Sequence, residues 1–153
     1  MFSKIKKKTD EGGGLFRKIL PSRKASFTRK VTTPIGEGIS SPDKRHGELI
    51  QVPRYHRGTA LTFSWHPSLP SAAMVPEVAA ALQSYLDKAL DHIESDAELK
   101  EDVIENGGIF PMTIDWGRED CDFSISFGYV GWDDGILRFF FRSGEVVDTD
   151  VCD

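Results

Sequence analysis

Cysteine is scarce in this chain, with two among 153 residues, Cys121 and Cys152. A fold held by several disulfides is therefore excluded, and we expect both thiols to be reduced in a cytoplasmic location. Long apolar runs are also absent, since charged residues interrupt every stretch before the roughly 20 apolar residues of a membrane-spanning helix. Residues 1–8 are basic, but polar residues 9–14 stand where a secretory signal would be apolar, so we expect no export signal.

Familiar catalytic and metal-binding motifs are missing as well. The four histidines show no ligand spacing with one another or with the cysteines, so we expect no metal site and no cofactor. There is no Gly-x-Ser-x-Gly, and Cys121 lies in an acidic stretch that should raise the pKa of its thiol. These absences favour a binding protein over an enzyme.

Charge is distributed unevenly along the chain. The net charge is −5, but residues 1–60 hold fourteen Lys and Arg against five Asp and Glu. Residues 61–153 hold five Lys and Arg against nineteen Asp and Glu. Such segregation influences which partners a protein attracts and how fast they associate, and it says little about the fold.

The N-terminal third predicts little regular structure. Glycine, proline and serine punctuate it too densely for a long helix or strand. We expect residues 1–48 to form a basic, flexible or loosely docked arm, and residues 49–153 to form a single acidic domain. One short strand is expected near residues 49–52.

Hydrophobic periodicity is clear from residue 58 onward. Leu61, Phe63 and Trp65 alternate with polar residues, which indicates a half-buried strand. Apolar residues then recur at three- and four-residue steps from Val78 to Ile93, which predicts an amphipathic helix. A second helix is expected from the capping box at residues 95–98 to the glycine pair at 107–108.

The last forty-five residues predict four strands, at 109–116, 122–130, 136–142 and 145–151, with turn residues between them. The element order is then β-α-α-β-β-β-β. This order predicts an α+β fold with a mostly antiparallel sheet of about four to five strands and two helices packed on one face.

The candidate binding residues are aromatic and acidic. Tyr129 and Trp132 stand at a predicted strand end beside Asp133 and Asp134, a combination typical of protein interfaces that attract basic partners. Nearby carboxylates extend the predicted partner-binding face: Asp115, Glu119, Asp120 and Asp122. The alternative is that the aromatic rings fill the core and that the acids occupy turns and solvated edges.

The helical segment 76–105, followed by aromatic and acidic strands, resembles the small cytosolic immunity proteins of bacterial polymorphic toxin systems. The resemblance covers residues 60–153, including the stretches at 109–116, 127–134 and 136–141. It implies a non-catalytic inhibitor that neutralises a cognate toxin, with a basic-site toxin enzyme as the protein partner. The basic arm departs from this pattern. The alternative function is an adaptor whose arm binds nucleic acid or an anionic membrane.

Overall fold

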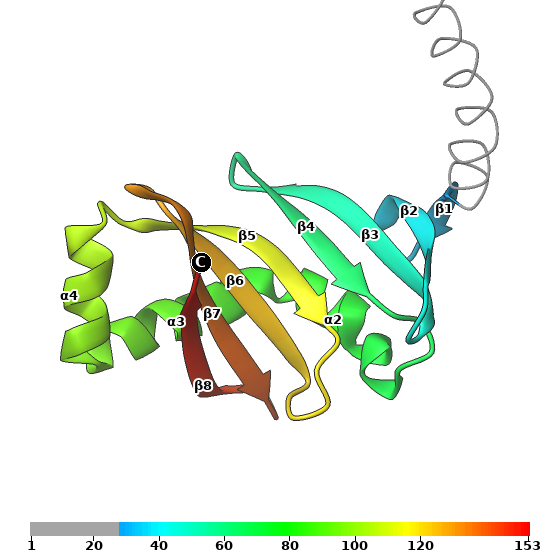
Figure 1. Ribbon diagram of the computed structural model, residues 1–153. Helices are drawn as coiled ribbons and strands as arrows, with labels where there is room; N and C mark the ends of the chain where they lie inside the picture. Colours follow the sequence, from blue (N-terminus) through cyan, green and yellow to red (C-terminus); the bar gives the residue numbers. More distant parts are fainter. Residues whose placement is uncertain (1–27) are drawn as a thin grey trace, which may run out of the picture.

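Eight strands form one sheet, and each strand lies beside the next one along the chain (Figure 1). The structure is a computed structural model and describes residues 28–153. The first four strands are β1 (Arg29–Thr33), β2 (Gly36–Asp43), β3 (Gly47–His56) and β4 (Thr59–Trp65). The helical segment consists of the 3-10 helix η1 (Pro70–Met74), α2 (Val75–Ala80), α3 (Leu82–Ser95) and α4 (Ala97–Glu105). The last four strands are β5 (Ile109–Trp116), β6 (Phe123–Tyr129), β7 (Trp132–Arg142) and β8 (Glu145–Cys152).

The predicted sheet of four to five strands, the predicted pair of helices and the order β-α-α-β-β-β-β are wrong, since residues 28–153 form eight strands and three α-helices, although the fold class remains α+β. Residues 29–48, assigned above to the arm, contain β1, β2 and the start of β3, which extend the sheet to eight strands. Residues 1–27 of the predicted arm lie outside the described residues. The glycines in this segment serve the turns, since Gly36 and Gly47 have φ values of 132° and 85°, which residues with a Cβ rarely adopt.

Two prolines lie inside these strands without breaking them. Pro42 is paired with β3 but lies beyond Ser40, the last residue of β2 that is paired with β1. Pro53 is paired with β4 but lies beyond Gln51, the last residue of β3 that is paired with β2. Each proline therefore lies beyond the last paired residue on one of its two sides, a position at which strands tolerate a missing N–H.

The helices connect the only parallel pair of strands in the described sheet. β4 and β5 run parallel, and every other neighbouring pair is antiparallel. A parallel pair requires a long crossover, which the segment from η1 to α4 provides. Figure 1 shows α2 and α3 passing behind the sheet, with α4 standing at one end.

The core lies between the helices and one face of the sheet. As the periodicity predicts, α3 buries Leu82, Leu86, Ala89 and Ile93, while Leu90 is 46% exposed. The sheet contributes Phe63, Trp116 and the inward residues of β6 and β7. Phe123 stacks on Phe141 with ring centroids 4.9 Å apart, which makes the centre of this core largely aromatic.

The start and end of α4 are fixed by specific contacts. Asp96 is the N-cap residue, and its side chain accepts a hydrogen bond from the Leu99 N–H. Gly107 and Gly108 end the helix with φ values of 77° and 101°, as the sequence predicts. The turn between β6 and β7 is then attached to this end, because the Val130 N–H donates to the Gly108 carbonyl.

Candidate functional site

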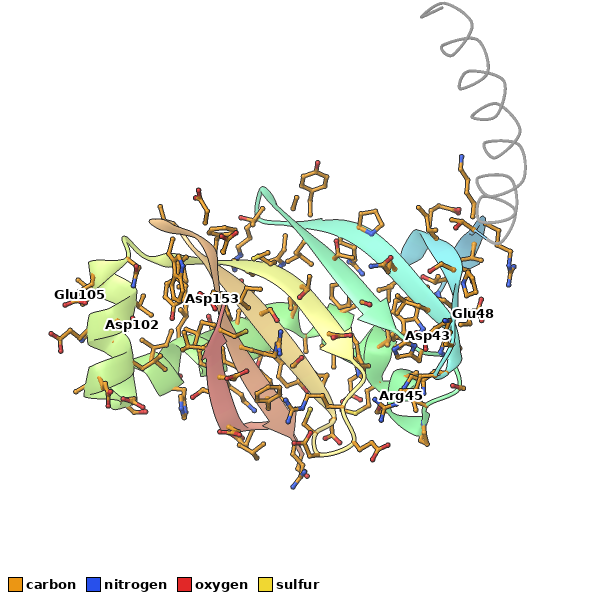
Figure 2. All side chains as sticks on the ribbon, viewed as in Figure 1. Asp43, Arg45, Glu48, Asp102, Glu105 and Asp153 are labelled. Atoms are coloured by element: carbon orange, nitrogen blue, oxygen red, sulfur yellow. The ribbon has the colours of Figure 1, made fainter. Side chains whose placement is uncertain are left out.

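A groove with a volume of about 470 Å³ separates α4 from β8. Figure 2 shows Asp102 and Glu105 on α4 at this end of the molecule, where Asp153 also lies. Two residues of β8, Thr149 and Val151, line the groove from the sheet, and Leu99 contributes from the helix. All the other lining residues are carboxylates, namely Asp96, Glu98, Glu101, Asp102 and Glu105. The groove is therefore strongly acidic.

The helical repeat explains how α4 presents so many acids on one side. Glu98, Glu101, Asp102 and Glu105 follow one another at steps of three, one and three residues, which places them on one face. Like charges at this spacing destabilise a helix by about 0.2–0.5 kcal/mol per pair. Glu105 also stands at the negative end of the helix dipole. The acidic face thus slightly destabilises α4. Helix stability therefore does not account for this concentration of acids.

The groove carboxylates have no cationic partner among residues 28–153. Lys100 is the one cation within α4, and it pairs with Glu94 instead at 2.7 Å. Asp96 caps the helix, and Asp102 accepts hydrogen bonds from Tyr129 and Asn106. These neutral donors leave the negative charge of the groove uncompensated.

β8 is an edge strand, so one side of its backbone is unpaired within the described sheet. Among the described strands, β8 pairs with β7 alone. An edge of this kind presents N–H and C=O groups that can pair with another chain. Glu145, Asp148 and Asp150 give the strand three acids, which discourage pairing between two copies of this chain. The same charges attract a basic strand.

The structure separates the predicted binding residues into two groups at opposite ends of β6. Tyr129 and Trp132 lie at the α4 end, together with the exposed Asp133 and Asp134. Asp115 pairs with Ser124 at the start of β6, next to the loop of residues 117–122 that contains the other three acids. Seven strand residues span about 20 Å, so the eight residues do not form one face.

Tyr129 belongs to the core rather than to an exposed rim. Its exposed fraction is 2%, and its ring lies 5.4 Å from that of Trp132, centroid to centroid. The Tyr129 hydroxyl donates to Asp102 Oδ2 at 2.6 Å, so it holds one groove carboxylate in place. Burial, together with the negative charge of Asp102, raises the pKa of Tyr129 well above its usual range.

We expect Tyr129→Phe to lower the free energy of unfolding by about 1.5–3 kcal/mol, because a hydrogen bond to a charged group is lost. Urea denaturation at neutral pH measures this cost. Tyr85→Phe is the matched control, since the Tyr85 hydroxyl has no hydrogen-bond partner among residues 28–153 and should change stability little. Equal stability losses in the two variants would contradict the structural role of the bond to Asp102.

The second group of predicted residues is engaged in contacts within the protein. Arg118 makes two hydrogen bonds to Asp120, at 2.9 and 2.6 Å, and this pairing lowers the pKa of the Asp120 carboxyl. The Arg118 guanidinium lies 4.2 Å above the ring centroid of Phe140. Asp122 accepts a hydrogen bond from the Ser143 N–H. Asp120 and Asp122 are thus engaged within the protein, whereas Glu119 is exposed and lies 3.8 Å from Arg45.

Two further groups near this loop have shifted pKa values. Burial raises the pKa of the Cys121 thiol, and Asp120 adds to the increase, so the predicted direction is confirmed. Limited solvation also raises the pKa of Asp115, although His66 and Arg138 act in the opposite direction. A thiol with a raised pKa is mostly protonated at neutral pH and is a weak nucleophile.

One cluster was not predicted from the sequence at all. Asp43, His46 and His66 come together at the end of the sheet away from α4. His46 and His66 are twenty residues apart, so no local spacing reveals them. The register of β2, β3 and β4 would have revealed them, because Asp43 pairs with Gly47 and Ile50 pairs with Trp65.

Comparison with protein-family models, with curated proteins and with solved structures finds no match to this chain. Within the part of the chain that the structure describes, no helix is long and apolar enough to cross a membrane.

Proposed function

We propose that this chain is a binding protein of the immunity or inhibitor type, acting in the cytoplasm, that holds a basic segment of a partner protein. The observation that supports this proposal is the groove between α4 and β8, which combines five carboxylates with an unpaired strand edge. A surface that serves only solubility has no need to concentrate uncompensated charge beside an open sheet edge.

The binding mode follows from the two walls of the groove. An extended partner segment pairs its backbone with β8, as in other cases of strand addition to a sheet edge. Its Lys and Arg side chains reach Glu101 and Glu105 on α4, while its apolar side chains contact Leu99 and Val151. The exposed Asp133 and Asp134 extend the negative field toward the start of β7.

Electrostatic steering suits an inhibitor that has to capture a harmful enzyme quickly. Complementary charge raises association rates toward about 10⁸–10⁹ M⁻¹s⁻¹ at low salt. Nucleases and other enzymes that act on phosphates present basic surfaces, which an acidic groove complements. The resemblance of residues 60–153 to immunity proteins agrees with this role. The alternative, an adaptor that works through its basic arm, depends on residues 1–48, of which residues 1–27 lie outside the described part of the chain.

The test uses charge reversal in the groove. We expect Glu101→Lys combined with Glu105→Lys to weaken binding of a peptide of alternating Lys and Val by about 10-fold or more at low salt, because charge attraction becomes repulsion. The matched control is Glu77→Lys combined with Asp91→Lys, which changes the net charge equally on exposed positions of α2 and α3. Calorimetric titration measures the affinities, and circular dichroism confirms that each variant is folded.

A second peptide separates strand pairing from charge. N-methylation of alternate peptide bonds removes backbone donors and should abolish most of the binding if the peptide pairs with β8. The proposed groove is wrong if wild type and both double variants bind the Lys–Val peptide equally. The inhibitor role is tested in cells, where wild-type protein should relieve growth arrest by the toxin-like product of a neighbouring gene and the groove variant should not.

A further inference from the structure

Three side chains with metal-binding chemistry meet at the end of the sheet away from the groove. Asp43 ends β2, His46 lies in the turn before β3, and His66 directly follows β4. One ligand atom from each residue lies within 4.8 Å of the other two. Figure 2 shows Asp43 beside Glu48 at this end, across the molecule from Asp102 and Glu105.

The strand register holds these groups in place. Asp43 Oδ2 accepts a hydrogen bond from the His46 N–H at 2.7 Å, which fixes the turn. His66 Nδ1 lies 3.7 Å from Asp43 Oδ2 and 3.1 Å from the Glu48 carbonyl oxygen. The two imidazole rings have centroids 4.5 Å apart. The cluster is thus built on paired strands, and an ion bound to His66 Nδ1 replaces the hydrogen bond to the Glu48 carbonyl.

We propose that Asp43, His46 and His66 bind one divalent cation of the zinc class. Zinc lies about 2.0–2.2 Å from imidazole nitrogens and carboxylate oxygens, so two of its ligand atoms are about 3.3–3.5 Å apart in tetrahedral geometry. The Asp43–His66 separation is close to this value. The His46 ligand atom lies within 4.8 Å of the other two, so the His46 ring has to move closer for the ion to bind.

The donor set decides between classes of cation. Calcium and magnesium take oxygen ligands almost exclusively, whereas two imidazoles and one carboxylate suit zinc and its neighbours in the first transition row. The side chains of His66 and Asp43 are 13% and 30% exposed, so an ion can enter and yet lose much of its hydration. The Asp43 carboxylate supplies negative charge beside the two imidazoles.

Three protein ligands leave at least one coordination position open. His46 lines a cavity of about 510 Å³ whose opposite wall is the loop of residues 117–122. An open position facing this cavity is available to water or to a donor group of a bound molecule. The site is therefore more like an exchangeable metal centre than a closed structural one.

The Asp115 carboxylate lies near His66, although no hydrogen bond or ion pair joins the two side chains in the described residues. A Cβ added at Gly117 would lie 3.7 Å from His66 Nε2 and 4.0 Å from Asp115 Oδ1, so both atoms flank the same point. When Nδ1 binds the ion, the imidazole proton moves to Nε2, on the side of Gly117.

Titration of the full chain with Zn²⁺, after removal of metals with a chelator, tests the proposal. We expect one equivalent to bind, and we expect His46→Ala and His66→Ala to weaken binding by about 100-fold or more, beyond the loss of an orienting partner. Asp43→Asn is the milder variant, because its amide oxygen can still accept the His46 N–H, and it should weaken binding by about 10-fold or more. Residues 1–27 contain no His or Cys to interfere.

His56→Ala is the matched control, since His56 bonds to Gln83 elsewhere in the protein and should leave zinc affinity unchanged. Nitrogen NMR of the imidazoles provides a second readout, in which zinc should shift His46 and His66 and leave His56 and His92 in place. The proposal is overturned if wild type binds no zinc in the micromolar range. It is also overturned if the Ala variants bind as tightly as wild type, or if Cys121→Ser alone abolishes binding.

Discussion

Replacing Phe123 by alanine is expected to lower the free energy of unfolding by about 3–5 kcal/mol, the range for a large aromatic side chain in a well-packed core. Phe123 is fully buried, with an exposed fraction of 0%. Its ring lies 4.9 Å from Phe141, 5.1 Å from Tyr85 and 5.5 Å from Trp116, measured between centroids. Alanine removes all three contacts at once and leaves a cavity that rigid strands cannot close.

Chemical denaturation followed by tryptophan fluorescence measures this loss, because Trp116 is one of the affected neighbours. The control is Phe110→Ala, at a phenylalanine of β5 that is 42% exposed. We expect that change to cost about 1 kcal/mol or less, since exposed positions contribute little. If the two variants lost similar stability, Phe123 would not lie at the centre of the core.

The elements that the sequence predicted correctly are those with strong local signals. Alternation at Leu61, Phe63 and Trp65 matches β4, while the three- and four-residue steps from Val78 to Ile93 match two helices, α2 and α3, instead of the one predicted. The glycine pair after α4 and the turns between the last strands also carry their own chemistry. Such patterns depend on neighbouring residues, so they are readable without knowledge of the rest of the fold.

The first two strands were missed, and the third was predicted only over residues 49–52, because their formation depends on partners distant in the sequence. Residues 29–43 are rich in glycine, serine and proline, and β1 has no buried residue. These strands gain stability by pairing, from β1 through β3 to β4, rather than from hydrophobic alternation. The parallel contact of β4 with β5 is also non-local, since more than forty residues separate Thr62 from its partner Thr113.

The candidate site was also predictable only in the parts that depend on local sequence. The acids of α4 are visible in the sequence as a helical repeat, but only the position of β8 turns that repeat into the wall of a groove. Tyr129 and Trp132 were predicted to lie at the rim of an interface, because sequence cannot distinguish an exposed ring at a strand end from a buried ring beneath a helix. The alternative interpretation, that they fill the core, agrees with their burial.

Trp132→Ala is expected to lower the free energy of unfolding by about 2–3 kcal/mol, somewhat less than for a fully buried tryptophan. Trp132 is half-buried, packs on Tyr129 and lies against the backbone of Gly135, where a Cβ would collide with the indole. Loss of the indole should destabilise the start of β7. It should also weaken the packing of Tyr129, whose hydroxyl holds Asp102. Thermal unfolding and urea denaturation both measure the effect.

Asp133→Lys combined with Asp134→Lys gives the complementary result at the two residues that follow Trp132. Both side chains are exposed and have no ion-pair partner among residues 28–153, so reversal should change stability by less than about 0.5 kcal/mol. It should nevertheless slow association with the Lys–Val peptide, most clearly at low salt, because the negative field at this end becomes weaker. Stability loss in the tryptophan variant and slower association in the charge variant would show that the Trp132 ring stabilises the fold and that Asp133 and Asp134 attract the peptide. A folded Trp132→Ala protein of wild-type stability that no longer binds the peptide would instead make the ring part of the interface.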